Sequence, residues 1–364
     1  MNRFFPEIRK NFGFGFMRLP MNGDQVDLET TAKMVDAFLN AGFNYFDTAH
    51  GYIGGQSETA LRHCLTSRYP REKYILTNKL SGSFFETGKE ILPLFQAQLE
   101  ACGVEYFDFY LMHAMNRRSH IRYREAGAYR IVQELKRQGR IRHVGMSFHD
   151  TAEVLDQILT DQPEIEVVQI QYNYVDYEDP NVQSKACYEV CVKHGKPVIV
   201  MEPVRGGSLV NLPERARALL TGGSIASYAI RFAATPDQMM MVLSGMSDMA
   251  QVEDNIRYMT DFKPLTHEEQ AIIARVRTIY QGQNRIPCTA CRYCADGCPA
   301  GIPIPDLFAA FNDLRQKKEG AGEAYAAAPA RGADCLDCGQ CEAICPQNLQ
   351  IRQLLNAVDE AFGG

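Results

Sequence analysis

Residues 288–299 read CTACRYCADGCP, and residues 335–346 read CLDCGQCEAICP. Both stretches place four cysteines at the spacing C-x-x-C-x-x-C-x-x-x-C, and a proline follows the last cysteine. Side-chain packing imposes no such spacing, so two copies of one pattern indicate a shared chemical task. The cysteines concerned are Cys288, Cys291, Cys294, Cys298, Cys335, Cys338, Cys341 and Cys345.

This spacing is typical of bacterial proteins that bind two [4Fe–4S] clusters through thiolates. In such proteins the first three cysteines of a run bind one cluster, and the fourth binds the other cluster. We therefore expect Cys345 to complete the cluster of the first run and Cys298 to complete the cluster of the second. Zinc is a weaker alternative, because zinc sites combine two C-x-x-C pairs. Disulfides fit poorly, because the first residues show no secretory signal.

The length and amino-acid composition indicate a chain with a sizeable apolar core. It has 364 residues, of which 46% are apolar, and a formal charge of −6. This length suits one large domain and one small domain, and the acidic balance argues against a nucleic-acid partner. No apolar run reaches the length of a membrane span. The remaining cysteines are expected to be reduced thiols of a cytoplasmic protein: Cys64, Cys102, Cys187 and Cys191.

Short apolar runs alternate with helical patterns from residue 12 to about residue 260. Strands are expected at Phe12–Phe16, Tyr45–Asp47, Tyr74–Thr77, Phe107–Met112, His143–Ser147, Val167–Gln171, Val198–Glu202 and Met241–Leu243. Helices are expected between them at Leu28–Ala41, Ser57–Leu65, Ile91–Cys102, Tyr129–Gln138, Ala152–Leu159, Val182–His194, Ile225–Ala233 and Met249–Met259. This alternation predicts an α/β fold, a closed (β/α)₈ TIM barrel.

A small, mainly α-helical ferredoxin-like domain is expected after the barrel. The predicted domains are residues 1–262 and residues 263–364. Within the second domain, Asp306–Lys318 has a helical pattern, and the Ala/Gly-rich stretch Gly320–Ala330 is expected to be a mobile loop.

Catalytic residues of such barrels lie at the C-terminal ends of the strands. Asp47, Lys79 and His113 stand at those ends, and Tyr52 follows in the loop after the second strand. The stretches around them resemble the aldo/keto reductase family over about residues 12–260. These stretches are GFNYFDTAHGY (42–52), SE (57–58), TNK (77–79), LMH (111–113), LKRQGRIRHVGMS (135–147) and DNI (254–256).

The resemblance implies a tetrad that reduces a carbonyl with hydride from a nicotinamide: Asp47, Tyr52, Lys79 and His113. A free tyrosine phenol has a pKa of about 10 and is a weak acid at neutral pH, whereas a neighbouring ammonium favours its ionised form. Lys79 would supply that ammonium, Asp47 would hold Lys79, and His113 would orient the substrate oxygen. Each residue also has a plainer alternative. Asp47 would cap a helix N-terminus, Lys79 would be a solvated loop charge, and His113 would be a hydrogen-bonded core histidine. His50 lies three residues after Asp47. One interpretation places it at the same barrel mouth, and the favoured one makes it an ordinary polar loop residue.

The resemblance also implies nucleotide contacts along the barrel mouth. The matched residues are Ser147, Gln169 and Met201 for the nicotinamide, Gly206, Gly207 and Ser208 for the pyrophosphate, and Asp254 and Asn255 for the adenine. Two positions depart from the family: Phe148 stands where it usually has asparagine, and Met201 stands where it usually has an aromatic residue. For Gly206 and Gly207, the alternative to a pyrophosphate contact is a plain tight turn. NADPH differs from NADH by a 2′-phosphate, which needs a cationic partner. Residues 245–251 contain no Lys or Arg, so NADH is slightly favoured and NADPH stays open.

Three functions remain open. The favoured one is an NAD(P)-dependent oxidoreductase for a small-molecule carbonyl or alcohol, in which the clusters are structural or carry electrons. The second couples the barrel to a ferredoxin-like redox partner, although hydride carries two electrons and each cluster carries one. The third is a non-catalytic redox sensor, against which the complete tetrad argues. Substrate choice is expected to come from the loops Asn116–Ala128 and Val175–Asn181.

Overall fold

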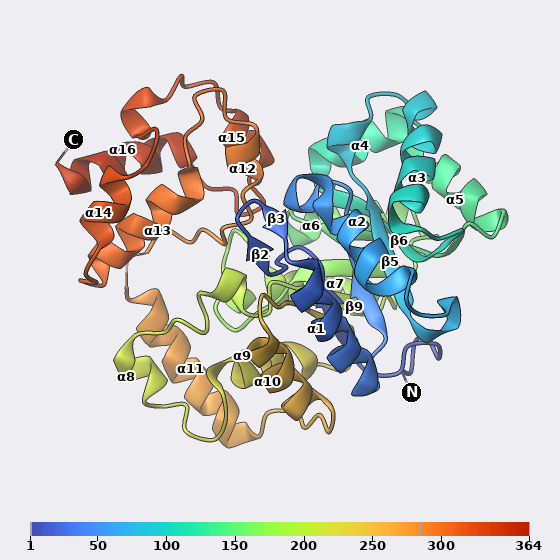
Figure 1. Cartoon of the computed structure of the whole chain (residues 1–364), viewed down its shortest axis with the longest axis horizontal. Helices are drawn as coiled ribbons and strands as arrows, with labels where there is room; N and C mark the ends of the chain where they lie inside the picture. Colours follow the sequence, from blue (N-terminus) through green and yellow to red (C-terminus); the bar gives the residue numbers. More distant parts are fainter. Residues whose placement is uncertain (1, 284, 364) are drawn as a thin grey trace. The chain divides into compact units, whose positions relative to one another are not determined.

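A closed barrel of parallel strands forms the framework of the first part of the chain (Figure 1). The computed structural model describes residues 2–283 and 285–363. The strands follow the order β1, β4, β5, β6, β7, β8, β9, β10 around the barrel, and β10 pairs with β1. They are β1 (Phe12–Gly15), β4 (Tyr45–Asp47), β5 (Ile75–Leu80), β6 (Phe107–Met115), β7 (Ile141–Phe148), β8 (Val167–Gln171), β9 (Val198–Met201) and β10 (Met239–Gly245). The predicted (β/α)₈ barrel is therefore confirmed.

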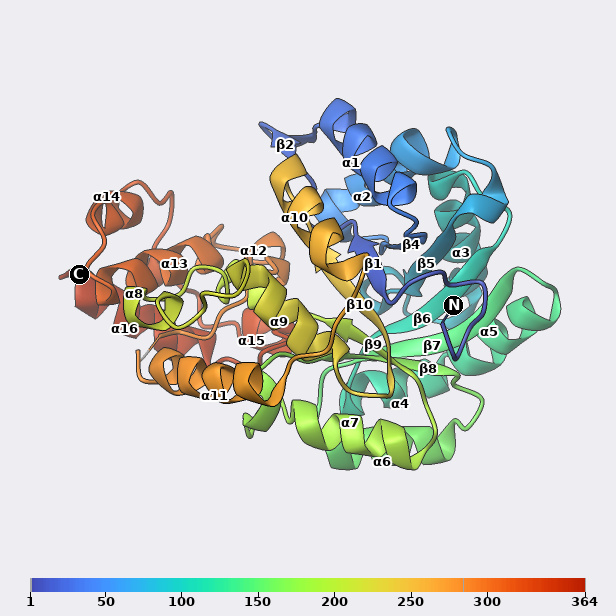
Figure 2. The ribbon, with the colours of Figure 1, turned by 90° about the horizontal axis from the view of Figure 1, so that it is seen from below.

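Helices cover the outside of the barrel. In Figure 2, α6 (Ala152–Asp161) and α7 (Ser184–Lys193) lie together outside the green strands β7 to β9. The others are α1 (Leu28–Asn40), α2 (Gln56–Leu61), α3 (Gly88–Cys102), α4 (Arg117–Glu125), α5 (Ala128–Arg137), α9 (Ile225–Ala234) and α10 (Met249–Met259). A short hairpin of β2 (Met21–Asn22) and β3 (Gln25–Val26) follows β1. Within residues 2–283 and 285–363, none of the helices combines the length and apolar character needed to cross a membrane.

The segment Asn116–Ala128, expected to be a loop, is largely helical because it contains α4. The Asn116 side chain accepts a hydrogen bond from the Ser119 amide at 2.8 Å, and the Asn116 amide donates one to Ser119 Oγ at 2.7 Å. Such reciprocal caps stabilise the first turn of a short helix. The cap therefore offsets the weak apolar pattern of this segment.

The stretch Gly320–Ala330, expected to be a mobile loop, contains the helix α14 (Ala321–Ala326). The Tyr325 ring stacks on Phe362 with centroids 4.3 Å apart, and the Tyr325 hydroxyl donates to Asp359 Oδ1 at 2.8 Å. These tertiary contacts explain why an Ala/Gly-rich stretch is ordered here.

The barrel interior is filled by large apolar side chains. The buried cluster consists of Phe5, Ile8, Tyr45, Ile75, Phe109, Leu111, Val167, Ile199, Met240, Met241 and Leu243. Gly13 on β1 makes room for them, because a Cβ atom there would lie 2.8 Å from Leu243 Cδ2 and 2.9 Å from Tyr45 Cδ1. Burying one large apolar side chain contributes about 1.5–3 kcal/mol, so the filled interior gives the strand ends a stable frame.

The N-terminal end of the barrel carries a hydrogen-bonded bridge around His143 on β7. Its Nδ1 lies 3.1 Å from Glu166 Oε2, and its Nε2 lies 2.9 Å from Glu7 Oε1. Burial opposes protonation of the ring, but the hydrogen bonds from Glu166 and Glu7 prevail and raise the pKa of His143 above its ordinary value. The His143 ring thus connects the segment before β1 to the segment before β8.

The internal contacts of the chain divide it into two units. The first comprises the residues up to Pro203 together with Ala226–Thr266, and the second comprises Val204–Ile225 together with the chain from His267 onward. The last boundary lies between Thr266 and His267, and the predicted domain boundary at residues 262/263 stays a prediction. The segment Val204–Ile225, which contains α8 (Glu214–Arg217), is grouped with the second unit although it lies between two barrel elements in the sequence.

The second unit is mainly helical. Its helices include α11 (His267–Gln281), α12 (Tyr293–Asp296), α13 (Ile304–Arg315), α15 (Gln340–Ile344) and α16 (Ile351–Phe362), and α13 and α16 lie side by side in Figures 1 and 2. Their buried side chains include Leu307, Phe308, Leu355 and Val358. The expected helical, ferredoxin-like arrangement is confirmed.

We predict that the free energy of unfolding falls as the pH rises above about 6.5, the ordinary pKa of histidine. Because the folded-state pKa of His143 is raised, its stabilising contribution is complete below pH 6.5 and is lost as the pH rises through the folded-state value. His143→Gln should flatten this dependence, which anaerobic urea unfolding followed by circular dichroism at several pH values would measure. An equally steep dependence in His143→Gln would assign the effect to other groups.

Candidate active site and cluster sites

Two side chains and one backbone carbonyl surround the buried ammonium group of Lys79. Lys79 lies on β5 with 0% of its surface exposed. Its Nζ donates hydrogen bonds to Asp47 Oδ1 at 2.6 Å and to the Thr48 carbonyl at 2.9 Å. It also donates to the Tyr52 hydroxyl oxygen at 3.2 Å. The structure therefore brings together the predicted residues Asp47, Tyr52 and Lys79 at the C-terminal ends of β4 and β5.

Asp47 and Lys79 form a buried ion pair in which each charge depends on the other. Burial raises the pKa of the Asp47 carboxyl and lowers the pKa of Lys79, since both charged forms lose hydration. The attraction between the two groups opposes both shifts. The short contact and the additional acceptor at Thr48 favour the charged pair, so a cation is held against the Tyr52 hydroxyl.

His113 on β6 faces Tyr52, with ring centroids 5.9 Å apart and planes inclined at 78°. Its Nδ1 shares a hydrogen bond of 2.6 Å with Ser81 Oγ. Burial lowers the pKa of His113 well below its ordinary value, and the charges of Lys79 and His149 act in the same direction. The ring is therefore neutral at pH 7 and suits the orientation of a neutral carbonyl group. The fourth predicted residue thus joins the other three.

The sequence did not indicate Ser81 or His149 as site residues. Ser81 directly follows β5, so its place next to a strand end was the available signal. His149 directly follows β7, and burial lowers its pKa to about 4. Ser81 fixes the His113 ring through its hydrogen bond, whereas His149 is a second buried histidine close to it.

The loop that carries Tyr52 has a left-handed backbone directly after the tyrosine. Ile53 has φ 53° and ψ 46°, and it is followed by Gly54 with φ 59° and Gly55 with φ 89°. This conformation costs a non-glycine residue roughly 1–2 kcal/mol, and isoleucine is β-branched. Such strain persists only where the surrounding structure holds it, so the position of Tyr52 depends on contacts from the rest of the loop.

Ser147 and Gln169, expected at the nicotinamide, are register partners on β7 and β8. Ser147 Oγ accepts a hydrogen bond from the Ala114 amide at 2.8 Å. Gln169 Oε1 is buried and has no hydrogen-bond partner among the described residues. An unsatisfied buried acceptor costs about 1–3 kcal/mol, so this position fits a ligand with an amide donor, such as a nicotinamide. Met201 ends the next strand, β9, and is partly exposed.

Asp254 and Asn255, expected at the adenine, lie on α10. Asn255 donates to Ser244 Oγ at 3.3 Å and accepts from the Tyr258 hydroxyl at 2.5 Å. Asp254 is paired with Arg257, the nearest cation in sequence for a 2′-phosphate. Both residues are therefore anchored within the first unit, and their contact with adenine stays a prediction.

A cation from a different loop lies beside residues 245–251. Arg18 follows β1 and packs on Gly245, where a Cβ atom would lie 3.1 Å from Arg18 Cβ. The Arg18 carbonyl accepts a hydrogen bond from Ser247 Oγ at 2.9 Å, and its guanidinium lies 3.7 Å from Glu202 Oε1. The sequence did not reveal this cation, because Arg18 is far from residues 245–251 along the chain.

The residues expected at the pyrophosphate, Gly206, Gly207 and Ser208, belong to the second unit. Gly206 has φ 61°, and a Cβ atom there would lie 2.2 Å from the carbonyl oxygen of Thr289. Thr289 directly follows Cys288 in the first cysteine run. The close approach to that run by itself requires glycine at position 206, and the pyrophosphate contact stays a prediction.

Two cavities in the second unit are lined by the motif cysteines. The first is lined by Cys288, Cys291, Cys294 and Cys345, together with mostly apolar residues. The second is lined by Cys298, Cys335, Cys338 and Cys341, also among mostly apolar residues. Each cavity thus receives three cysteines from one run and the fourth from the other run. Four thiolates in this combination fit a [4Fe–4S] cluster.

The two cysteine runs share one backbone conformation. Ala290 and Arg292, on either side of Cys291, have φ of 53° and 67°. At the same places of the second run, Asp337 and Gly339 have φ of 53° and 73°. A short helix follows in each run, α12 in the first and α15 in the second. Because the left-handed residues recur at the same places, each run directs its first three cysteines toward one cavity with the same backbone geometry.

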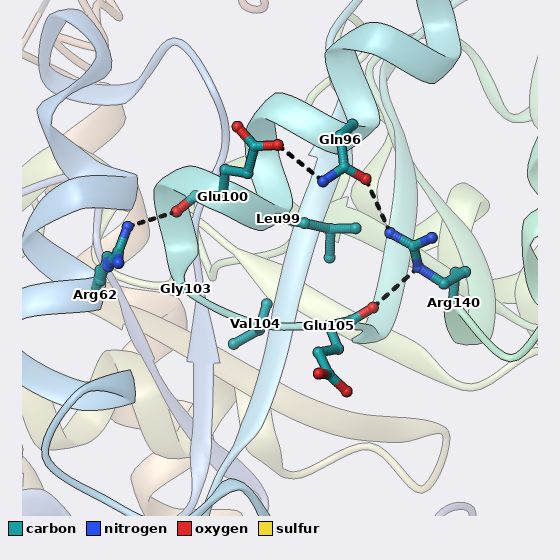
Figure 3. A pocket seen from close by; sticks show the side chains of 8 residues that line it. All are labelled: Arg62, Gln96, Leu99, Glu100, Gly103, Val104, Glu105 and Arg140. Atoms are coloured by element: carbon teal, nitrogen blue, oxygen red, sulfur yellow. Dashed lines mark hydrogen bonds between the residues drawn. The ribbon is translucent and has the colours of Figure 1, made fainter.

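A separate surface pocket lies at the N-terminal ends of β6 and β7 (Figure 3). Arg62 donates to the Glu100 carbonyl at 2.9 Å, and Arg140 donates to the Glu105 carbonyl at 3.1 Å. Gln96 accepts from Arg140 and donates to the Glu100 carboxylate. The direction of the strands places this pocket at the end of the barrel opposite to the tetrad.

Comparisons with known proteins match two parts of the chain to two families. A model of the aldo/keto reductase family matches residues 11–278, and a model of the 4Fe-4S dicluster domain matches residues 287–349. The tetrad lies within the first match, and all eight motif cysteines lie within the second.

Individual relatives are similar to the barrel part. An aldo-keto reductase of Mycolicibacterium smegmatis is 32% identical over 143 residues, 39% of this chain and 50% of that protein. The NADH-specific methylglyoxal reductase of Escherichia coli is 25% identical over 195 residues, 48% of this chain and 57% of that protein. The chain thus spans little more than half the length of these relatives. The crystal structure of an aldo-keto reductase from Klebsiella pneumoniae in complex with NADPH, 19% identical, has a TM-score of 0.59 and covers 73% of this chain and 90% of its own.

We predict that Cys345→Ala disrupts the cluster of the first cavity and spares the cluster of the second. The substitution removes one of four thiolates from the first cavity, whereas the second cavity keeps all four. The iron content of anaerobically reconstituted protein should fall from about eight atoms per chain toward about four, the iron of a single [4Fe–4S] cluster.

Double variants identify which cluster is lost. Adding Cys288→Ala to Cys345→Ala should cause little further loss of iron, because both residues line the first cavity. Adding Cys335→Ala should remove nearly all iron, because Cys335 lines the second cavity. The reverse pattern would mean that each run binds its own cluster.

Proposed function

Because the chain belongs to the aldo/keto reductase family and carries a 4Fe-4S dicluster domain, we propose that it interconverts a carbonyl and an alcohol at the tetrad. The hydride comes from NADH or NADPH, and the proton comes from Tyr52. The observation that carries this proposal is the buried Lys79 ammonium, which lies 2.6 Å from Asp47 and 3.2 Å from the Tyr52 oxygen. The substrate is a small aldehyde or ketone, or the matching alcohol.

The tetrad performs the proton half of this reaction. A bound nicotinamide supplies the hydride, and the carbonyl oxygen gains negative charge as the hydride arrives. Tyr52 donates its proton to that oxygen, and the ammonium of Lys79 stabilises the phenolate that remains. Asp47 holds Lys79 in place. His113 is neutral and fixed by Ser81, so it orients the carbonyl oxygen between itself and Tyr52.

The nucleotide would bind along the C-terminal end of the barrel. Ser147 and the unsatisfied Gln169 Oε1 would contact the nicotinamide carboxamide, beside Met201. Asp254 and Asn255 would contact the adenine. NADH is favoured slightly over NADPH, because residues 245–251 contain no Lys or Arg and the neighbouring Arg18 guanidinium already lies 3.7 Å from Glu202 Oε1. Similar proteins support either nucleotide, since the methylglyoxal reductase of Escherichia coli is NADH-specific and the aldo-keto reductase from Klebsiella pneumoniae was crystallised with NADPH.

The eight cysteines would hold two [4Fe–4S] clusters, one in each cavity. The clusters have either a structural role, in which they fix the fold of the second unit, or an electron-transfer role. Electron exchange with a redox protein partner is the second candidate function. It is supported by the exposure of Cys338, which places one ligand of the second cavity at the surface.

Anaerobic addition of NADH or NADPH to the oxidised protein separates these two roles. If the nucleotide alone reduces the clusters, a new absorbance change and an EPR signal should appear, and a converter between two-electron and one-electron chemistry must exist. With structural clusters, we expect the nucleotide to bind while the spectra of the clusters stay unchanged.

We predict that Tyr52→Phe lowers kcat for carbonyl reduction by at least about 10²-fold, because proton donation by a positioned side chain contributes about 10²–10⁴-fold. The Kd for the nucleotide, measured by its fluorescence, should stay the same. Tyr129→Phe is the matched control, because the Tyr129 hydroxyl binds His120 outside the tetrad. If Tyr52→Phe retained full activity, Tyr52 would not be the proton donor.

A further inference from the structure

Glu58 is a buried carboxylate next to the tetrad, at the start of the chain's second barrel helix. It lies on α2 with only 1% of its surface exposed. Its Oε1 accepts a hydrogen bond from Asn78 Nδ2 at 2.7 Å, and its Oε2 lies 2.7 Å from His50 Nδ1. A buried carboxylate is costly unless its oxygen atoms are satisfied, and these two partners come from two different elements.

The first partner of Glu58 leads to the backbone of Lys79. Asn78 directly precedes Lys79 on β5, and its Oδ1 accepts a hydrogen bond from the Lys79 amide at 2.8 Å. Gln98 on α3 donates to the same Asn78 oxygen at 3.2 Å and to the Lys79 carbonyl at 2.9 Å. The Tyr110 hydroxyl in turn donates to Gln98 Oε1 at 2.5 Å. Side chains thus hydrogen-bond to both the backbone amide and the backbone carbonyl of Lys79.

The second partner of Glu58 leads to the loop of Tyr52. His50 stands two residues before Tyr52, and its bond to Glu58 spans the left-handed turn at Ile53. A second bridge spans the same turn, because Thr48 Oγ1 lies 2.7 Å from Ser57 Oγ. The His50 ring also packs edge-on against Phe84, with centroids 4.6 Å apart. His50 is therefore part of the support of this loop, which corrects the expectation of an ordinary polar residue.

We propose that Glu58 is a positioning residue that connects the loop of the proton donor Tyr52 to the strand of Lys79. Glu58 touches neither the substrate nor the reacting atoms. Its two hydrogen bonds set the separation between the Tyr52 hydroxyl and the Lys79 ammonium, which is 3.2 Å. Since a misplacement of about 1 Å can cost about 10²-fold in rate, a bridge at this place controls turnover more than binding.

The inference rests on the proposed carbonyl–alcohol chemistry and is tested with Glu58→Gln in the cluster-loaded protein. This variant keeps the size of the side chain and removes its charge. We expect kcat to fall roughly tenfold to 10²-fold, while KM for the carbonyl substrate and Kd for the nucleotide stay within about twofold. The alkaline limb of the pH–kcat/KM profile should move to higher pH, because a displaced Lys79 favours the ionised phenol of Tyr52 less.

Glu166→Gln is the matched control. Glu166 also bridges a histidine, His143, and a second side chain, Lys136, but it does so at the opposite end of the barrel. Glu166→Gln should lower stability and leave kcat and the alkaline limb unchanged. His50→Ala provides a second test variant. It removes the hydrogen bond between the Tyr52 loop and Glu58 but keeps the one between Glu58 and Asn78, and His50 is partly exposed. It should change kcat in the same direction as Glu58→Gln.

Folded Glu58→Gln and His50→Ala proteins with the kcat and alkaline limb of the parent protein would overturn the proposal. Hydrogen exchange of the amides at residues 51–56 and 79–80 gives a readout that needs no activity. Exchange there should be faster in Glu58→Gln and unchanged in Glu166→Gln. If the parent protein reduces no aldehyde or ketone with either nucleotide, the proposed function fails, and hydrogen exchange still decides whether Glu58 joins the two segments.

Discussion

The attraction between the Asp47 carboxylate and the Lys79 ammonium is the interaction on which the active end of the barrel depends. Burying both charges costs several kcal/mol for each ion, and replacing such a pair by apolar side chains is often neutral or stabilising. Stability alone therefore does not explain its presence. What the pair achieves is a fixed cation 3.2 Å from the Tyr52 oxygen, and the filled barrel interior supplies the rigidity that keeps the cation there. Removing either partner would leave an uncompensated buried charge, so the two residues can only be replaced together.

The barrel and the tetrad were predictable from the sequence because their signals are local and repeat along the chain. Each strand is a short apolar run, and a residue at a strand end must lie at the common mouth. That rule gives Asp47, Lys79 and His113 as candidates, and the resemblance to aldo/keto reductases adds Tyr52 and predicts the catalytic role. The cysteine runs were predictable for a similar reason, since the spacing within each run reflects the geometry of its ligands. The cavities that the eight cysteines line agree with the crossed arrangement.

Features that depend on contacts between distant residues were not predictable. Arg18 comes close to Gly245 only after the barrel has closed. The glycine at position 206 was matched to a nucleotide, whereas its close neighbour is the carbonyl of Thr289. Ser81 gave no signal in the sequence, and Glu58 stood out only as part of a stretch that resembles the family, because hydrogen bonds to His113 and to Asn78 produce no sequence pattern. The helix α4 was missed since its stability comes from the Asn116 cap and not from an apolar stripe.

The exchange of the fourth cysteine between the two runs has a consequence for biosynthesis. The first cavity takes three cysteines from residues 288–294 and its fourth from Cys345. Cys345 is the last cysteine of the second run, so it is translated after all the others. During translation, neither cavity has its full set of sulfur ligands until α13 and α14 have been made and have folded back. A chain that ends before Cys345 would therefore lack one of the four cysteines that line the first cavity, although its own first run would be complete.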